Sequence, residues 1–298
     1  MKRNTIGLIV LIVVLGVAAW LVTTKPGEQS ALVEEGRPLV TIDSIAIDKI
    51  SIKISTGTVV LEKQGTDWFV TSPLKYKADQ NSVGQVLHQS KQLNVKSVVS
   101  SKPEKQAVFQ VDSTGTRVVL SQAGQERASF VVGKNSQSYS EQYVRLANSN
   151  DVTLVDGSFG YIFNKQLKEW RDKNIVTVPR EQIKEIKYQF GDTTFTATFK
   201  DSSWMVGKDS VQSGVMDPLL GALASVQCDD FIDTVVAKPS IAAQISYAGV
   251  QLHFMLDKAS SKYWVRASSS PQWFTMEQWR VNQILKRKKE IAKESKKR

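Results

Sequence analysis

An internal repeat constrains this chain more than any other feature of its sequence. When residues 47–103 are aligned with residues 183–239, a displacement of 136, nine of the fifty-seven positions are identical without a gap. Ordinary composition gives roughly three or four identities by chance. The identical pairs are Ile47/Ile183, Ile50/Ile186, Thr58/Thr194, Trp68/Trp204, Val70/Val206, Leu87/Leu223, Val99/Val235, Lys102/Lys238 and Pro103/Pro239. We therefore expect two tandem, divergent copies of one unit.

The downstream part of the repeat has a shorter displacement of 121 residues. Tyr143-Val144-Arg145 then aligns with Trp264-Val265-Arg266. The second copy is shorter than the first by the difference between the two displacements, about fifteen residues.

Both copies share one pattern of predicted elements. Short β-branched or aromatic runs predict strands over residues 50–54, 59–61 and 68–70, repeated over 186–190, 194–199 and 204–206. An amphipathic helix follows each set, with Asp79 or Asn81 as the expected N-cap in the first copy and Asp217 before Pro218 in the second.

Further strands are predicted over 118–120, 129–132, 143–146 and 152–155. A helix is then expected to carry Phe159, Ile162, Phe163, Leu167 and Trp170 on one side. Strands outnumber helices, so the predicted class is α+β: an antiparallel sheet plus a helix in each copy.

Residues 6–22 carry no charge and include twelve Ile, Leu or Val. As a helix this run spans about 25 Å, close to the thickness of a bilayer core. We expect residues 1–24 to be a signal-anchor transmembrane helix, and a cleaved signal peptide is the alternative. Lys2 and Arg3 before the run favour a single-pass topology in the cytoplasmic membrane, N-terminus inside and folded part extracytoplasmic.

These features predict a division of the chain. Residues 25–38 read as a linker, 39–178 as the first repeat, 179–279 as the second, and 280–298 as a basic C-terminal helix or tail. Eight Lys or Arg and two Glu over residues 286–298 give +6 of the net charge of +10, and Lys2 and Arg3 give +2, which leaves +2 for the body. A nucleic-acid partner is therefore not expected, whereas the tail could contact anionic lipid or be a solvated, frayed end.

Groups suited to catalysis or metal binding are sparse. The chain has two histidines, His88 and His253, and neither has a second ligand at a metal spacing. Cys228 is interpreted as a small buried hydrophobe, and the pair Asp229-Asp230 as a solvated loop rather than paired catalytic carboxylates. We predict no enzymatic activity, no catalytic residue, no metal and no cofactor.

Arg145 and Arg266 follow an aromatic–Val pair in both copies. A planar guanidinium on a strand could contact an anion or a glycan, or it could pair with a neighbouring side chain. Trp68 and Trp204 are candidates for the core of the repeat, with sugar stacking as the alternative.

The chain resembles the DUF4340 family, a domain of unknown function. The resemblance is carried by the strand over 47–52, the segment from Leu61 to Pro73, Tyr143-Val144-Arg145 and Trp170-Arg171-Asp172-Lys173. Asp209 stands where the second copy would need Pro73. The resemblance implies a single-helix-anchored envelope protein, often associated with gliding-motility-type ABC transporters, and it supplies no catalytic residue.

The sequence thus favours a non-enzymatic, membrane-anchored accessory or scaffold protein. Its expected partners are the lipid bilayer through the N-terminal helix and an envelope protein such as an ABC-transporter component. A periplasmic glycan- or lipid-binding module that uses Arg145 and Arg266 is the second hypothesis, and a hydrolase that combines His88 or His253 with Ser and Asp is the third.

Overall fold

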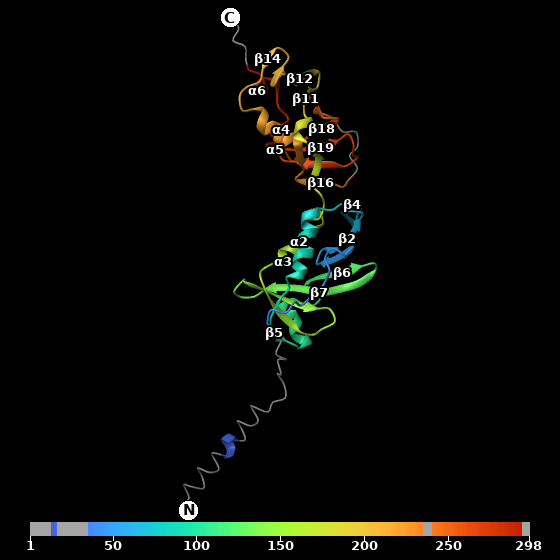
Figure 1. Cartoon of the computed structure of the whole chain (residues 1–298), viewed down its shortest axis with the longest axis vertical. Helices are drawn as coiled ribbons and strands as arrows, with labels where there is room; N and C mark the ends of the chain where they lie inside the picture. Colours follow the sequence, from blue (N-terminus) through green and yellow to red (C-terminus); the bar gives the residue numbers. More distant parts are fainter. Residues whose placement is uncertain (1–12, 17–34, 235–239, 294–298) are drawn as a thin grey trace, which may run out of the picture. The chain divides into compact units, whose positions relative to one another are not determined.

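The computed structural model describes residues 13–16, 35–234 and 240–293 (Figure 1). The chain divides into two compact units, Met1–Gln166 and Leu167–Arg298. Each unit contains one nine-stranded sheet, and every strand pair in it is antiparallel. A small two-stranded sheet pairs β10 (Asn174–Thr177) with β15 (Ser225–Gln227) in the second unit. The mostly antiparallel sheets with a few helices confirm the α+β class.

The sheet of the first unit has the order β4-β3-β2-β1-β6-β7-β8-β9-β5. Its strands are β1 (Lys49–Ile54), β2 (Gly57–Gln64), β3 (Asp67–Ser72), β4 (Tyr76–Lys77), β5 (Val95–Ser100), β6 (Thr116–Gln122), β7 (Gln125–Asn135), β8 (Glu141–Leu146) and β9 (Val152–Asp156). Between β5 and β6 the chain forms the 3-10 helix η1 (Pro103–Phe109).

The sheet of the second unit has the order β14-β13-β12-β11-β17-β18-β19-β20-β16. Its strands are β11 (Glu185–Phe190), β12 (Thr193–Lys200), β13 (Ser203–Val206), β14 (Asp209–Ser210), β16 (Asp230–Ile232), β17 (Ala243–Tyr247), β18 (Val250–Asp257), β19 (Lys262–Ala267) and β20 (Trp273–Met276). The 3-10 helix η3 (Arg180–Gln182) precedes them.

The two sheets follow the same path. Each begins with a four-stranded meander and crosses through a helix to the strand at the far edge of the sheet. The next strand pairs with the first strand of the meander, and the following strands continue outward one by one until the last pairs with that edge strand. β11 begins 136 residues after β1, whereas β19 begins 121 residues after β8, and these are the two displacements read from the sequence.

A helix covers one face of each sheet. In the first unit, α2 (Gln80–Lys91) and α3 (Gly160–Phe163) lie side by side against the strands (Figure 1). Asp79 caps α2, because its carboxylate accepts a 2.6 Å hydrogen bond from the backbone N–H of Ser82. Val83 and Val86 on α2 are fully buried, as their helical spacing predicted.

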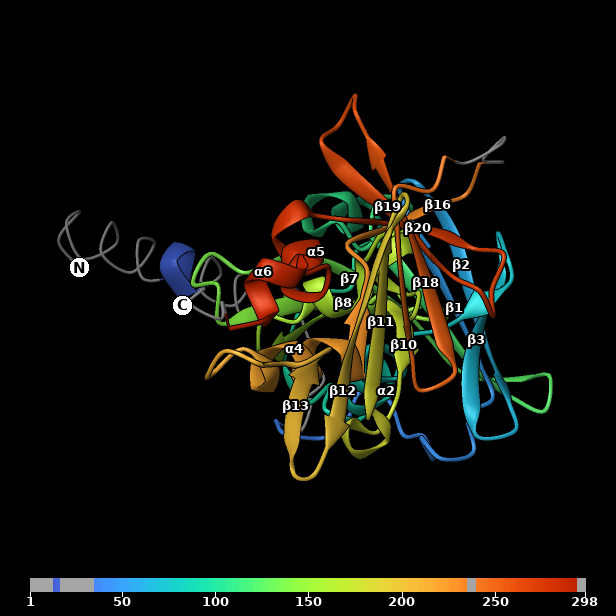
Figure 2. The ribbon, with the colours of Figure 1, turned by 90° about the horizontal axis from the view of Figure 1, so that it is seen from above.

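In the second unit, α4 (Met216–Ala224), α5 (Gln278–Ile284) and α6 (Lys288–Ile291) lie on one side of the sheet (Figure 2). Their buried residues include Leu219, Leu223 and Ile284, which pack in one core with Ile186, Phe254 and other inward-facing strand residues. These contacts define the helix-covered face, and we call the opposite side of this sheet its outer face.

Two local expectations were wrong. The helix predicted over 159–170 stops after α3, because Asn164 leaves the helical conformation with ψ at 61°, and a separate 3-10 turn, η2 (Leu167–Glu169), follows. Asp217 does not cap α4, because that helix begins one residue before it. Asp217 instead forms an ion pair with Arg180.

The C-terminal segment over residues 280–298 was expected to be a basic helix or tail, and its described part includes helical residues of α5 and α6. As far as Ala292 it is part of the second core, because Val281, Ile284 and Ile291 are buried there. Arg287 stacks on the ring of Phe190, 3.8 Å from the guanidinium carbon to the ring centroid. The apolar residues of the C-terminal segment are thus buried in the core despite the segment's many basic residues. Residues 294–298 lie outside the described part of the chain.

The predicted anchor over residues 6–22 lies outside the described residues, except for one helical turn at 13–16. Within the part of the chain that the structure describes, no helix has the length and apolar character needed to cross a bilayer.

Candidate functional site

The outer face of the second sheet carries a row of side chains at one level. Gln244 on β17 is the register partner of His253 on β18, which is the partner of Arg266 on β19. Trp273 on β20 is the partner of Ile232 on β16. Alternate residues of a strand point to opposite faces of a sheet. The side chains of this row therefore point to the outer face, whereas those of the neighbouring residues Leu252 and Val265 point into the core.

Arg266 makes its principal contact with Trp273. The guanidinium carbon lies 4.9 Å from the centroid of the indole ring, which is cation–π geometry. The Nε atom of Arg266 is buried and has no hydrogen-bond acceptor in the described part of the chain. A buried N–H of this kind costs free energy until an acceptor reaches it.

His253 lies beside Arg266 and also has a buried side-chain nitrogen without a hydrogen-bond partner among the described residues. This nitrogen is the Nδ1 atom of the imidazole. Burial, followed by the nearby charge of Arg266, lowers the pKa of the imidazole below 6.5, so His253 is neutral at pH 7. A neutral imidazole can offer one donor and one acceptor.

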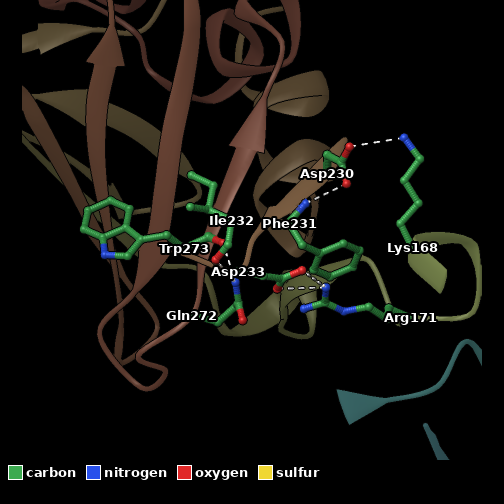
Figure 3. Close-up of polar contacts among 8 residues, drawn as sticks. All are labelled: Lys168, Arg171, Asp230, Phe231, Ile232, Asp233, Gln272 and Trp273. Atoms are coloured by element: carbon green, nitrogen blue, oxygen red, sulfur yellow. Dashed lines mark hydrogen bonds and ion pairs between the residues drawn. The ribbon is translucent and has the colours of Figure 1, made fainter. Parts of the chain in front are cut away.

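A network at the sheet edge positions Trp273 (Figure 3). The side-chain amide of Gln272 donates to the carbonyl oxygens of Ile232, at 2.8 Å, and of Trp273, at 2.6 Å. This amide therefore ties β20 to the edge strand β16. In Figure 3 the indole of Trp273 points away from Phe231 and Arg171.

Two ion pairs hold β16 from its other side (Figure 3). The Arg171 side chain is 2% exposed, and its Nη1 donates to both carboxylate oxygens of Asp233, at 2.9 and 2.8 Å. Its guanidinium also lies over Phe231, 3.7 Å from the ring centroid. Lys168 donates to Asp230 at 3.2 Å. Arg171 of the Trp170-Arg171-Asp172-Lys173 segment therefore helps to hold the strand next to Trp273.

Arg145 occupies the equivalent position of the first sheet, on β8, but its surroundings differ. Its Nε donates to the carbonyl oxygen of Val111 at 2.8 Å. Its Nη1 donates to the carbonyl oxygens of Leu146, at 3.1 Å, and Ser149, at 3.0 Å. The Arg145 guanidinium is thus bound by the chain itself.

Val111 belongs to residues 109–112, which we call the covering segment. It begins at Phe109, the last residue of η1, and packs on the first sheet, where Phe109 and Val111 contact Val131, Val152 and Tyr143. Gly115 and Gly133 permit this close approach, since a Cβ at Gly133 would collide with the carbonyl oxygen of Phe109 and lie 2.7 Å from Cγ1 of Val111. The sequence reading missed this segment, although a glycine within a strand signals a close backbone approach.

The two tryptophans of the repeat differ in burial. Trp68 is 7% exposed, whereas Trp204 is half-buried at the margin of the second core. His88 is exposed on α2 of the first unit, whereas His253 belongs to the second unit.

Asp229 and Asp230 have separate partners. Asp229 accepts from the backbone N–H of Glu277 at 2.8 Å and from Nε of Arg280 at 2.9 Å, which fixes the start of α5. Asp230 pairs with Lys168. Among residues 13–16, 35–234 and 240–293, no three His, Cys, Asp or Glu side chains gather in a metal-binding arrangement.

A second polar cluster, also missed, lies at the loop between β7 and β8. The carboxylate of Glu141 accepts hydrogen bonds from Lys96, at 2.8 Å, and from the hydroxyls of Ser136 and Ser138. These bonds, that of Lys96 first, lower the pKa of Glu141 to about 2, and Glu141 raises the pKa of Lys96. Both groups are therefore charged at pH 7 and fix the loop.

Comparison with known proteins identifies the family. Residues 68–245 match the family model described as Domain of unknown function (DUF4340). The match covers more than half of the chain, which therefore belongs to this family. It spans parts of both units and includes Trp68, Arg145 and Arg171. No curated protein and no solved structure matches the chain.

Proposed function

We propose that this chain is a non-enzymatic accessory or scaffold protein of the cell envelope, held in the cytoplasmic membrane by residues 6–22. In this proposal both sheet units are extracytoplasmic and bind a partner protein. An ABC-transporter assembly is the partner that the family resemblance suggests. The shared strand order further supports descent of the two units from one duplicated unit.

The observation that carries the binding role is Arg266. Its guanidinium is stacked on a tryptophan and makes no hydrogen bond within the described residues, although the neighbouring ionic groups are paired. Arginines and tryptophans contribute much of the binding energy in protein interfaces. Arg145 and Trp68 do not support the glycan- or lipid-binding alternative, because the chain's own carbonyls bind Arg145 and because Trp68 is buried.

Membrane attachment is tested by weakening the apolar run. Twelve Ile, Leu and Val favour insertion by about −5 kcal/mol, and two arginines oppose it by about 6 kcal/mol. We expect alkaline carbonate to leave the full chain in the membrane and to extract the Leu11→Arg/Leu15→Arg variant. The matched control Leu11→Ile/Leu15→Ile should stay in the membrane. Extraction of the unmodified full-length chain would contradict the proposal.

The partner role is tested by cross-linking in intact cells, followed by purification of the tagged full chain. We expect one envelope protein to be enriched reproducibly, and protease added to spheroplasts to digest both sheet units. Recovery of no partner, or turnover of a substrate by the purified chain, would count against the accessory role.

A further inference from the structure

We infer that the outer face of the second sheet binds an acidic peptide segment of a partner protein, whose carbonyl and carboxylate oxygens accept hydrogen bonds from Arg266. This inference rests on the proposed function in taking the partner to be a protein. It adds the residues that bind the partner and the chemistry of the segment that is bound.

The first unit shows what binds an arginine at this position. There the covering segment supplies the carbonyl oxygen of Val111 to Arg145. The next residue, Asp112, adds a carboxylate whose pKa is lowered, chiefly by its hydrogen bonds with Thr114 and in part by the charge of Arg145. The covering segment thus gives the guanidinium a backbone carbonyl oxygen as acceptor, and the negative charge of Asp112 interacts favourably with it.

The second unit has the same arginine without such a segment among the residues described. Arg266 lacks both an acceptor for its buried Nε and a carboxylate partner there. His253 is the register partner of Arg266 on β18, and its Nδ1 is the other buried nitrogen of this site without a hydrogen-bond partner among the residues described. Two neighbouring polar groups that are desolvated but unpaired form a prepared site, in which Arg266 can donate a hydrogen bond to a ligand oxygen and the His253 imidazole can donate or accept one.

The charge of the site selects an acidic partner over a neutral one. The immediate row neighbours of Arg266 are His253 and Trp273, and neither carries a negative charge. A carboxylate accepts from a guanidinium more strongly than an amide does, by about tenfold or more in affinity. The planar indole beneath Arg266 limits its side-chain freedom, which reduces the entropy lost on binding.

The probe is a peptide that contains the chain's own covering segment and the two residues after it. It is an acetylated and amidated peptide of residues 109–114, Phe-Gln-Val-Asp-Ser-Thr. The matched control peptide carries Asn in place of Asp. Binding to the full chain in detergent micelles is followed through the imidazole NMR signals of its two histidines. His253 lies at the site, and His88 in the first unit is the internal reference.

We expect the Asp peptide to shift the His253 signals saturably and to leave those of His88 unchanged. The Asn peptide should bind about tenfold more weakly. Arg266→Lys, which keeps the charge but loses the planar fork, should weaken binding of the Asp peptide about tenfold, and Arg266→Ala should abolish it.

Equal affinity for the two peptides, equal shifts at both histidines, or no shift at millimolar peptide would overturn the inference. It would also be wrong if Arg266→Ala disturbed the unliganded second unit as strongly as Arg145→Ala disturbs the first, because Arg266 would then be satisfied within the chain. The proposed function can survive either result, since membrane retention and partner co-purification are measured separately.

Discussion

Arg145 and Arg266 occupy equivalent positions in two sheets of identical strand order, but Arg145 is bound by the chain itself whereas Arg266 is not bound in this way. Arg145 donates to the carbonyl oxygens of Val111, Leu146 and Ser149, and its burial lowers the pKa of its guanidinium. Arg266 is stacked on Trp273, and its Nε has no acceptor in the described ranges. One position of the repeat is therefore bound by the chain's own carbonyl oxygens in the first unit and stacked on an indole ring in the second.

The first prediction compares the two arginines. Arg145→Ala removes three charge-assisted hydrogen bonds and leaves the carbonyl of fully buried Val111 without its donor, which should destabilise the first unit by about 2–3 kcal/mol. Arg266→Ala loses mainly a cation–π contact and should cost the second unit less than about 1 kcal/mol. Native-state hydrogen exchange at the amides of β8 and β19 measures both free energies.

Arg145→Lys is the control for charge alone. It keeps a cation but cannot reach three carbonyl oxygens with a planar fork, so most of the loss should persist. Equal destabilisation by Arg145→Ala and Arg266→Ala would show that the two positions are alike after all.

The second prediction concerns the close approach of the covering segment. Gly133→Ala places a methyl group against the carbonyl of Phe109 and the side chain of Val111, so it should destabilise the first unit by about 1–3 kcal/mol. Exchange of the amides at residues 109–112 should become faster, because the segment is displaced from the sheet.

Gly84→Ala is the matched control, because the same substitution there meets nothing within 4 Å. Gly84 is exposed in the interior of α2, where alanine should stabilise the helix by about 0.5–1 kcal/mol. Opposite signs for the two substitutions would support the packing argument, whereas a neutral Gly133→Ala would refute it.

The sequence predicted the repeated framework because that framework depends on local patterns. Alternating β-branched residues gave strands that became β1 and β11, and the polar Asp79 marked the start of α2 correctly. The displacements of 136 and 121 residues are also those between the starts of β1 and β11 and of β8 and β19. Because the two sheets have the same strand order, equivalent strands follow one another at similar intervals in each copy.

The parts that could not be predicted depend on contacts between distant residues. Arg145 and Arg266 occupy the same position in the two copies of the repeat. Their hydrogen bonding differs because Arg145 contacts the covering segment at Val111, 34 residues earlier in the chain. Periodicity near the C-terminus does not reveal that Tyr188 donates to the carbonyl oxygen of Ile284, a contact between residues 96 positions apart. Asp217 failed as a cap because helix starts are uncertain by a residue or two.

The third prediction is a pH dependence of the loop between β7 and β8. The pKa of Glu141 falls from 4.5 to about 2 in the folded chain, first because Lys96 donates to it and then because the serines do. A depressed folded pKa gives stability that is present above the unfolded value of 4.5 and lost as the pH falls toward about 2. The loop should therefore open progressively across this interval.

A carbon-13 NMR titration of the Glu141 carboxyl measures its pKa directly, and amide exchange over residues 136–141 measures loop opening. Glu141→Gln should remove the acid-dependent part of the opening, whereas Glu104→Gln on the exposed η1 helix should leave it unchanged. A Glu141 titration near its ordinary value would contradict the arrangement with Lys96 and the serines.

The fourth prediction concerns Cys228, which lies between β15 and β16. The side chain is 2% exposed, and burial raises the pKa of its thiol to about 12. At pH 8 the thiolate fraction is then about one in ten thousand, so a thiol reagent should not label the native chain. Tyr139→Cys, at an exposed loop position, provides the reactive control when Cys228 is replaced by Ala in the same chain.

Labelling of Cys228 consequently reports opening of the second unit near β16. The backbone N–H of Cys228 donates to the carbonyl of Lys173 at 2.9 Å, which ties Cys228 to the segment that carries Arg171. Asp233→Asn weakens the ion pair with Arg171 and should increase the labelling rate several-fold without changing the labelling of the Tyr139→Cys control. Because the same edge strand supports Trp273 through Gln272, this variant should also loosen the indole on which Arg266 rests.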